Sequence, residues 1–172
     1  MLTLRGAELL RRADVVVYDS LVNRELLALA PESAEVLFGG KRPRDRAIPQ
    51  EELNRLLAEK AAAGKTVVRL KGGDPYIFGR GGEEAAGLRR DGVPFEVVPG
   101  ISSIIAAPSY AGIPLTHREH CSSFTVITGH EDPDKEESAL DWERIAREPG
   151  TKVLLMGVER IGKIAAALEA HG

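Results

Sequence analysis

The sequence is poor in cysteine, with Cys121 alone among 172 residues. A single cysteine cannot form an internal disulfide, which excludes a disulfide-stapled secreted scaffold and a cysteine-rich zinc module. Long apolar runs are also lacking, since no stretch approaches the roughly 18 residues that a membrane-spanning helix requires. Residues 1–5 have neither the charged nor the apolar region of a signal peptide. These absences predict a soluble globular protein of the cytoplasm with no membrane partner.

An excess of one charge is missing as well. The chain has 23 basic and 26 acidic residues, so its formal net charge is −3. A dedicated nucleic-acid-binding protein would carry a basic excess, so this balance argues against that class. Hydrophobic residues make up 43% of the chain although aromatic residues make up only 5%. The hydrophobic share suits a folded core and is too high for a disordered tail.

Short apolar runs alternate with helical patterns along the chain. The runs predict strands at residues 15–18, 35–38, 66–70, 95–98, 124–128 and 152–156. Helical spacing predicts a helix opened by Pro49 and ended by Gly64, and helices at residues 83–90, 101–111, 142–147 and 159–170. This alternation predicts an α/β fold with mostly parallel sheets. The charged stretch 131–137 is expected to be an exposed loop.

A break in the pattern at residues 112–118 predicts a domain junction. The expected domains are an N-terminal α/β domain, residues 1–113, and a partial C-terminal α/β domain, residues 119–172. Two strands and two helices make a thin core for an independent domain. The second domain is therefore expected to be incomplete, or to lean on the first domain or on another chain.

A glycine-rich loop at residues 71–82 follows one predicted strand. Ligands of open α/β sheets bind at the carboxyl ends of strands, so the position is suited to a binding site. Gly72 and Gly73 lack a Cβ and allow a ligand to touch the backbone, and Asp74 offers a carboxylate to hydroxyl or amine groups. The loop matches neither a P-loop nor a dinucleotide-binding turn. A tight structural turn and a ligand-binding loop explain these glycines about equally well.

Several motifs together resemble one family, the uroporphyrinogen-III C-methyltransferases of the tetrapyrrole methylase superfamily. The most specific is Gly72-Gly73-Asp74-Pro75 followed by Gly79-Arg80-Gly81-Gly82-Glu83-Glu84. Further matches run along the whole chain: Val16-Val17-Tyr18-Asp19, Lys41-Arg42, Pro49-Gln50, Val98-Pro99-Gly100-Ile101-Ser102-Ser103, Ala111-Gly112-Ile113-Pro114-Leu115-Thr116-His117-Arg118 and Thr128-Gly129-His130.

The resemblance implies a two-domain enzyme that binds S-adenosyl-L-methionine in the cleft between its domains and forms a homodimer. The implied reaction is methyl transfer to C2 and C7 of uroporphyrinogen III. Its products are S-adenosyl-L-homocysteine and precorrin-2, which feeds sirohaem and cobalamin synthesis.

The resemblance also implies roles for individual residues, position by position. Polar residues for substrate binding or catalysis would be Asp19, Arg80 and Glu83. Residues in contact with the cofactor would be Gly72, Gly73, Asp74, Ile77, Ser102, Ser103 and Met156.

The chain departs from the family pattern at both ends. The family begins with a strand and a Gly-x-Gly-Pro-Gly loop ahead of a segment like residues 2–4, and it continues for several elements beyond a segment like residues 165–172. At residues 46–48 many relatives carry a histidine that this chain lacks. The chain is therefore expected to be truncated. The alternatives are a sibling precorrin methyltransferase and a catalytically inert fragment that keeps the fold.

The chemistry of the implied substrate suggests roles for the charged residues. Uroporphyrinogen III carries eight carboxylates, which guanidinium groups bind bidentately. A basic patch suited to such a substrate consists of Lys41, Arg42, Arg44 and Arg46, with Arg118 as a further candidate, although an ordinary solvated loop explains the patch equally well.

Three residues are candidates for the reacting end of the site. Arg80 is a poor base, so we expect it to hold a substrate carboxylate while Glu83 orients Arg80 or a pyrrole N–H. Glu83 also suits a helix start, where the helix dipole favours a negative charge, and this structural role is compatible with the orienting role. Asp19 would accept a pyrrole N–H or help to remove a proton after methylation.

His117, His120 and Cys121 invite comparison with a metal site. A metal would need a fourth ligand and a partner segment, and the sequence shows neither, so no metal is predicted. Tyr76 and Phe78 either pack on a macrocycle or anchor the glycine-rich loop in the core.

Overall fold

The computed structural model describes residues 1–40, 48–131 and 138–172. The predicted loop at 131–137 and the basic residues Lys41, Arg42, Arg44 and Arg46 thus fall almost wholly or wholly outside the described residues. The chain divides into two compact units, Met1–Ser102 and Ser103–Gly172, which are described separately. In the described part, no helix has the length and apolar character needed to span a membrane.

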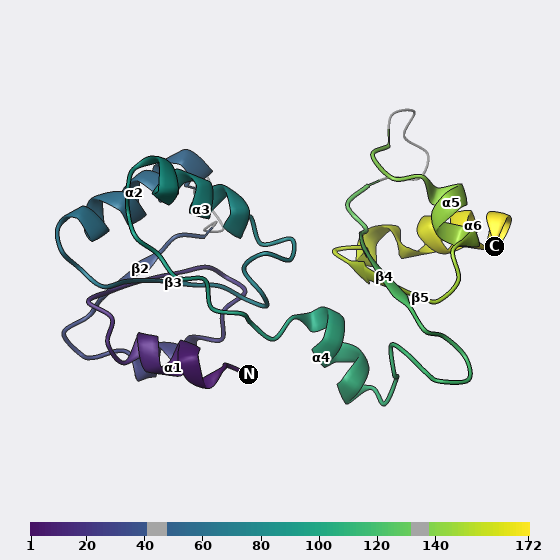
Figure 1. Ribbon diagram of the computed structural model, residues 1–172, viewed down its shortest axis with the longest axis horizontal. Coiled ribbons are helices and arrows are strands. Elements are labelled where there is room, and N and C mark those ends of the chain that lie inside the picture. Colours follow the sequence, from purple (N-terminus) through teal and green to yellow (C-terminus); the bar gives the residue numbers. More distant parts are fainter. Residues whose placement is uncertain (41–47, 132–137) are drawn as a thin grey trace. The chain divides into compact units, whose positions relative to one another are not determined.

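The first unit is a parallel sheet between two helical layers (Figure 1). Its strands are β1 (Val15–Tyr18), β2 (Glu35–Phe38) and β3 (Val67–Leu70), in the order β2-β1-β3. Helices α2 (Gln50–Ala62) and α3 (Gly81–Arg90) cover one face, and α1 (Leu4–Leu10) covers the other. A 3-10 helix, η1 (Arg24–Leu29), joins β1 to β2.

The central strand β1 shows why this sheet forms. Val15, Val16 and Val17 are completely buried. Val16 packs into the core cluster on the α1 side together with Leu10, whereas Val15 and Val17 pack with Leu53 and Leu57 of α2 on the opposite side. An unbroken β-branched run suits a strand that is buried on both faces. The strands predicted at 15–18 and 35–38 are confirmed to the residue, and the strand at 66–70 is confirmed within one.

The short helix α1 was not predicted from the sequence. Thr3 caps it, because its Oγ1 accepts a hydrogen bond from the N–H of Gly6 at 3.2 Å. A helix of seven residues spans too few turns to show a clear periodicity. The 3-10 helix η1 escaped notice for the same reason.

The strand predicted at residues 95–98 is wrong. The segment 93–100 belongs to no strand, because no described strand lies beside it to supply ladder hydrogen bonds. Apolar β-branched composition favours a strand, but only a partner at hydrogen-bonding distance makes one.

The second unit holds a smaller parallel pair, β4 (Phe124–Thr128) and β5 (Thr151–Leu155). Its helices are α4 (Ser103–Tyr110), α5 (Trp142–Arg147) and α6 (Ile161–His171), with a 3-10 turn η2 (Val158–Arg160) ahead of α6. Its core cluster consists of Ile127, Trp142 and Ile164. These elements confirm the predicted α/β pattern within two residues at most boundaries.

The structure places α4 differently from the expected domain division. Helix α4 contacts β5 and belongs to the second compact unit, which begins at Ser103. The division into domains at 1–113 and 119–172 stays a prediction, because a compact unit is not by itself an independently folding domain.

Candidate active site at the carboxyl edge of the first sheet

The predicted polar residues of the first unit gather where its strands end. Asp19 follows β1, Lys71 follows β3, and α3 begins after the glycine-rich loop. Parallel strands present their carboxyl ends at one edge, where α/β sheets bind ligands. The topology therefore brings Asp19 and the glycine-rich loop to the same edge.

Glycines in this loop have backbone reasons of their own. Gly73 has a φ of +74°, a conformation that side chains other than glycine rarely adopt. A Cβ on Gly81 would collide with the backbone oxygen of Pro75. The structural-turn interpretation is thus supported at Gly73 and Gly81. In addition, Gly72 and Gly73 are exposed, so their peptide groups face solvent without a side chain to cover them.

The carboxylate of Asp74 ties the loop to a second predicted cofactor segment. Its Oδ1 accepts from the N–H of Tyr76 at 2.9 Å, and its Oδ2 accepts from the N–H of Gly100 at 2.9 Å. The space beside Gly73 is bounded by the Cα of Ser102, 3.8 Å from where a Cβ would stand. Residues 72–74 and 100–102, far apart in sequence, therefore lie side by side.

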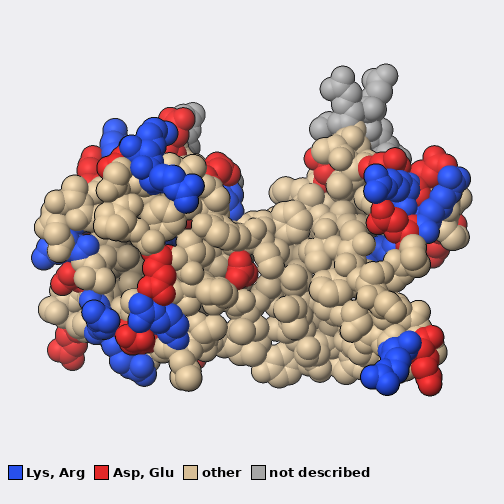
Figure 2. All heavy atoms as spheres, viewed as in Figure 1, with Lys and Arg blue, Asp and Glu red and all other residues tan. Residues whose placement is uncertain are grey.

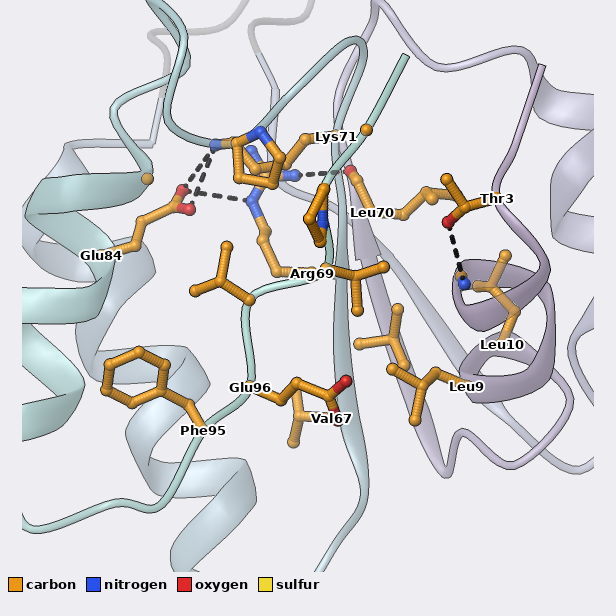
Figure 3. Close-up of a pocket in the computed structure, with 18 of the residues that line it drawn as sticks. Thr3, Leu9, Leu10, Val67, Arg69, Leu70, Lys71, Glu84, Phe95 and Glu96 are labelled. Atoms are coloured by element: carbon orange, nitrogen blue, oxygen red, sulfur yellow. Dashed lines mark hydrogen bonds and ion pairs between the residues drawn. The ribbon is translucent and has the colours of Figure 1, made fainter.

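A chain of alternating charges lies beneath this edge. Arg69 donates from Nη2 to Asp19 Oδ2 at 3.2 Å and from Nε to Glu84 Oε1 at 3.3 Å. Lys71 Nζ donates to both oxygens of Glu84, at 3.0 and 3.1 Å (Figure 3). The side chains of Lys71 and Glu84 are each 8% exposed. We call Asp19, Arg69, Lys71 and Glu84 the buried charge network.

This network anchors the predicted catalytic carboxylate. Asp19 Oδ1 accepts from the N–H of Leu21 at 3.0 Å while Oδ2 faces Arg69, so both oxygens have a partner. Arg69 is fixed in turn by the carbonyl oxygens of Val17 and Leu70, at 3.3 and 3.0 Å. A carboxylate held at both oxygens keeps one orientation.

Arg69, Lys71 and Glu84 were not singled out from the sequence as site residues. A signal was present, because Arg69 interrupts an otherwise apolar strand and Lys71 follows it directly. Charged residues at strand positions that face a core need partners. The partner, Glu84, stands 13 residues beyond Lys71, so spacing alone did not connect them.

The pair Arg80–Glu83 lies at the same edge but in solvent. Arg80 donates from Nε to Glu83 Oε1 at 2.9 Å and from Nη2 to Oε2 at 2.7 Å. Both side chains are more than half exposed. The hydrogen bonds from Arg80 lower the pKa of the Glu83 carboxyl below its ordinary value, and the same contacts raise the pKa of Arg80. The expected orienting contact of Glu83 on Arg80 is present, whereas their catalytic roles stay predictions.

Strained backbone marks the predicted site. In the part of the chain that the structure describes, the non-glycine residues with positive φ are Phe78 (49°), Arg80 (57°) and Met156 (57°). Such conformations in bulky residues gather at functional sites. Tyr76 and Phe78 are 55% and 47% exposed, so they do not anchor the loop in the core. Ile77 is half-buried, and its N–H donates to the carbonyl of Asp74 at 3.2 Å.

The remaining predicted site residues lie in the second unit. Ser103 opens α4, Met156 follows β5 and is 49% exposed, and Arg118 lies exposed in the turn between His117 and Cys121. On the first unit, side chains of both signs are interspersed over the visible face, on the left of Figure 2.

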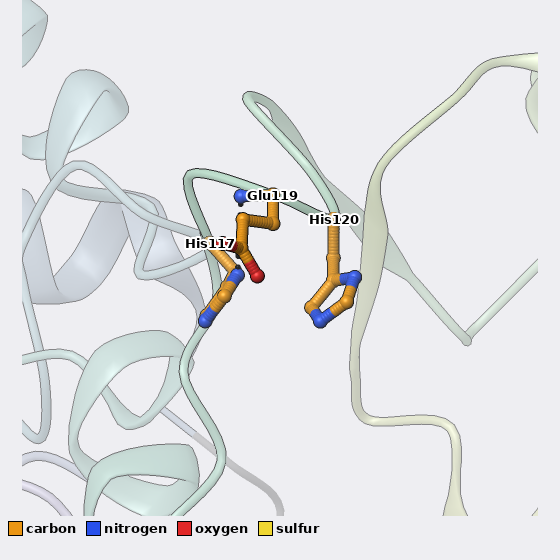
Figure 4. Close-up of side chains that lie close together, drawn as sticks. All are labelled: His117, Glu119 and His120. Atoms are coloured by element: carbon orange, nitrogen blue, oxygen red, sulfur yellow. Dashed lines mark hydrogen bonds between the residues drawn. The ribbon is translucent and has the colours of Figure 1, made fainter.

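The histidine cluster differs in composition from the one considered in the sequence. His117, Glu119 and His120 bring one donor atom each within 4.8 Å of one another (Figure 4). Their rings and carboxylate are exposed, and the two imidazoles stack at 4.5 Å. His117 Nδ1 accepts a hydrogen bond from the N–H of Glu119 at 3.2 Å, so the lone pair of that nitrogen is already engaged. Cys121 lies instead near the Leu115 carbonyl and the Thr151 hydroxyl.

Comparison with known proteins shows the family to which the chain belongs. The family model described as tetrapyrrole (corrin/porphyrin) methylases matches residues 1–172. The chain belongs to the tetrapyrrole methylase family. This finding confirms the resemblance and the fold class that the motifs predicted.

Individual members of the family narrow the relationship. The chain is 55% identical, over its whole length and 68% of the relative's, to the S-adenosyl-L-methionine-dependent uroporphyrinogen III methyltransferase of Methanosarcina barkeri. The uroporphyrin-III C-methyl transferase of Thermus thermophilus, complexed with S-adenosyl homocysteine, matches with a TM-score of 0.76 and 44% identity over 99% of this chain and 70% of that one. Cobalt precorrin-4 methyltransferase matches with a TM-score of 0.85 and 30% identity over 99% of this chain and 69% of the other.

Proposed function

We propose that this chain transfers methyl groups from S-adenosyl-L-methionine to C2 and C7 of uroporphyrinogen III, giving precorrin-2 and S-adenosyl-L-homocysteine. One observation carries the proposal: residues 72–74 lie beside residues 100–102 at the sheet edge that also holds Asp19. That arrangement occurs in a chain 55% identical to an enzyme named for this donor and this substrate.

The exposed backbone at the glycine-rich loop fits the methyl donor. Gly72 and Gly73 present peptide groups without side chains, and no hydrogen bond within the described residues occupies their N–H groups. Bare peptide groups can bind the amino-acid and nucleoside parts of the donor directly. We assign its binding to Gly72, Gly73, Asp74, Ile77 and Ser102 in the first unit, and to Ser103 and Met156 in the second.

S-adenosyl-L-methionine supplies a methyl group on a positively charged sulfur. The carbon–sulfur bond breaks as a bond forms to an electron-rich pyrrole carbon, and the electron pair stays on sulfur. Such a displacement depends on alignment of the reacting atoms more than on a strong base. The proton that the methylated pyrrole system loses goes to a base, and Asp19 holds a fixed carboxylate at this edge.

Arg80 and Glu83 serve the substrate in this proposal. A guanidinium group binds a carboxylate through two parallel hydrogen bonds, and uroporphyrinogen III carries eight carboxylates. Glu83 holds Arg80 in place, and a substrate carboxylate then replaces Glu83 as the acceptor of the hydrogen bonds from Arg80. Further carboxylates are assigned to Arg118 and to Lys41, Arg42, Arg44 and Arg46, which lie outside the described residues. A homodimer in the cytoplasm is part of the same proposal.

A second candidate is methylation of a later precorrin. The higher TM-score to cobalt precorrin-4 methyltransferase, 0.85 against 0.76, favours it. Fold similarity is shared across the family, whereas sequence identity is 30% to that enzyme and 44% to the Thermus thermophilus enzyme. Sequence identity indicates shared site residues better than similarity of fold does, so uroporphyrinogen III is the substrate proposed.

Two measurements test the proposal on the chain as it is. Calorimetric titration with S-adenosyl-L-homocysteine should show micromolar binding, and incubation with uroporphyrinogen III and the donor should yield the absorbance of the oxidised dimethylated product. Binding without this product, but with methylation of precorrin-4, would support the second candidate. No binding and no product would mean that the chain is an inert fragment.

A matched pair of variants tests the role of Arg80. We expect Arg80→Ala to raise the KM for uroporphyrinogen III by roughly tenfold or more while the affinity for S-adenosyl-L-homocysteine stays unchanged. Arg89→Ala removes an exposed arginine from the opposite end of α3 and should leave both values unchanged. Full activity of Arg80→Ala would contradict the assignment.

A further inference from the structure

Phe78 joins two features that are unfavourable in a large apolar residue. It is 47% exposed, and its backbone lies in the left-handed region with a φ of +49°. Exposure forgoes the burial that makes an aromatic ring favourable in a fold, and a positive φ is strained for a bulky side chain. Neither core packing nor backbone preference therefore accounts for a phenylalanine at this position.

The rest of the loop shows that glycine is used where space demands it. A Cβ on Gly79 or on Gly81 would collide with the carbonyl oxygen of Pro75. The positive φ values fall instead on the residues that alternate with these glycines, Phe78 and Arg80. The loop thus carries two large side chains where glycine would relieve the backbone, and such strain indicates a function for the side chains.

Arg80 already has a ligand in the proposed function, a carboxylate of the substrate. Phe78 stands two positions before it, so the two Cα atoms are at most about 7.6 Å apart. A macrocycle of four pyrrole rings that presents one carboxylate to Arg80 extends over such a distance. Since both side chains are exposed, one ligand can contact the two together.

Further apolar surface borders the polar groups at this edge. Tyr76 is 55% exposed, and Leu21 is 82% exposed. The Cβ of Leu21 lies 3.0 Å from the place of a Cβ on Gly72, and its N–H donates to Asp19 Oδ1, so Leu21 stands between the glycine-rich loop and the fixed carboxylate. Apolar faces beside a carboxylate and an arginine match a ligand that has apolar rings and a charged rim.

The exposed rings of the loop have no aromatic partner of their own. Elsewhere in the first unit, Tyr18 and Phe38 meet edge to face with their ring centroids 5.3 Å apart. In the part of the chain that the structure describes, no such pair includes Tyr76 or Phe78. A ring face that is open to solvent is free to stack on a flat ring of a ligand, an arrangement that aromatic groups favour.

We propose that Phe78 is a specificity-determining residue, which stacks on a pyrrole ring of the substrate while Arg80 binds a carboxylate of the same molecule. The inference rests on the proposed function, since uroporphyrinogen III supplies both the ring and the carboxylate. The strained backbone keeps the ring of Phe78 out of the core and open to the ligand. Phe78 thereby selects a ring, whereas Arg80 selects a negative charge.

Binding of uroporphyrinogen III to three variants tests this role. The ligand is kept reduced under argon, and S-adenosyl-L-homocysteine replaces the methyl donor, so that calorimetry measures affinity without turnover. Phe78→Asn removes the ring and suits a positive φ, and it should raise the Kd about tenfold. Phe78→Leu keeps the apolar bulk without the ring and should raise the Kd about threefold. Phe78→Tyr keeps the ring and should stay within about twofold of the parent.

Salt distinguishes stacking from attraction between charges. Contacts between apolar rings are not screened by ions, so Phe78→Asn should raise the Kd by the same factor at about 50 mM and about 500 mM salt. The effect of Arg80→Ala should shrink as the salt concentration rises, because ions screen the exposed guanidinium. A parallel decrease in the effect of Phe78→Asn would show that Phe78 acts only through Arg80, which would overturn the proposal.

Two controls separate recognition from folding. Leu4→Ala removes another apolar side chain, 92% exposed on α1, and should leave the Kd unchanged. In Phe78→Asn, relief of strain offsets the packing lost with the ring, so the melting temperature should stay within about 3 °C of the parent value and the affinity for S-adenosyl-L-homocysteine should not change. A larger drop in melting temperature with weaker S-adenosyl-L-homocysteine binding, in both Phe78→Asn and Phe78→Leu, would assign Phe78 a structural role instead.

Failure of this inference differs from failure of the proposed function. Parental affinity in Phe78→Asn, while the parent chain methylates uroporphyrinogen III, would overturn the role of Phe78 alone. About tenfold weaker binding in Phe78→Asn, while the parent chain gives no methylated product, would support the ring contact and contradict the proposed activity. A parent chain that does not bind uroporphyrinogen III would contradict both.

Discussion

Two pairs of opposite charges connect the glycine-rich loop to α3, and they differ in burial. Lys71–Glu84 is almost fully buried and continues through Arg69 to Asp19, whereas Arg80–Glu83 is more than half exposed. The exposed pair has the better geometry, with bidentate contacts at 2.9 and 2.7 Å. Hydrogen-bond geometry alone would predict that the exposed pair contributes more to stability than the buried pair.

Physical chemistry reverses that ranking for stability. Solvent and salt screen an exposed pair, so its net contribution is small. Breaking a buried pair leaves a charge without water or partner, which is strongly unfavourable. The buried charge network is therefore expected to maintain the loop and Asp19, while Arg80–Glu83 is free to exchange its partner for a ligand.

The largest effect is expected from Glu84→Ala. Removing this carboxylate leaves the buried Lys71 without its acceptor and takes from Arg69 one of its two carboxylate partners, which should lower the free energy of unfolding by about 3–5 kcal/mol. Urea denaturation followed by circular dichroism measures the loss. The matched control, Glu83→Ala in the same helical turn, should leave the midpoint nearly unchanged. Equal losses in the two variants would refute the distinction by burial.

A smaller loss is expected from Arg69→Lys. Lysine keeps the charge but cannot reach Asp19, Glu84 and two backbone carbonyls in one planar fork. The loss of hydrogen bonds in a buried place should cost about 1.5–3 kcal/mol of unfolding free energy. If the methyltransferase activity is present, kcat should fall more than KM rises, because Asp19 loses its anchor. A loss confined to KM would contradict this role.

The start of α3, which carries both Glu83 and Glu84, should depend on backbone fit as well as on charge. Gly81→Ala places a Cβ against the backbone oxygen of Pro75 and should cost about 1–3 kcal/mol. Gly82→Ala has open space and should be neutral or stabilising by up to about 1 kcal/mol. Thermal unfolding of the two variants compares neighbours in one turn. Equal destabilisation would argue that helix propensity, and not the contact with Pro75, decides the outcome.

The smallest effect should come from Glu83→Gln, and it should depend on pH. Arg80 lowers the pKa of Glu83 in the folded chain below its ordinary value of 4.5, so the ionised form favours folding. The contribution is present above pH 4.5 and is lost as the pH falls through the lowered folded value. The melting temperatures of the parent and the variant should therefore differ slightly at pH 7 and converge in acid. A difference that grows below pH 4.5 would have the wrong sign.

Much of the first sheet could be predicted because its signals are local. Three consecutive valines at 15–17 favour a strand that is buried on both faces, and the structure buries all three. The stripe containing Leu53 and Leu57 likewise places α2 on the sheet. The glycine-rich loop was recognised by its motif, and the structure supplies a backbone reason at Gly73 and Gly81.

The errors and omissions share a different cause. Residues 95–98 have the composition of a strand, but no backbone hydrogen bond joins them to another strand in the part of the chain that the structure describes. Arg69, Lys71 and Glu84 have oppositely charged partners 13 to 50 residues away. Short elements such as α1 carry too few residues for a pattern. For residues 95–98 and for the charged residues, the deciding interaction lies outside the window in which periodicity is visible, whereas α1 is shorter than that window.

Local composition and motifs were enough to establish the fold class, the strands at 15–18 and 35–38, and the family to which the chain belongs. They suffice because strand and helix preferences, and the glycines of a tight loop, act over a few neighbouring residues. Tertiary structure alone decided which charges are buried and which apolar segment has a partner. Burial and strand pairing are set by atoms that are distant in sequence, and these set both the dielectric around Glu84 and the pairing of β1 with β2 and β3.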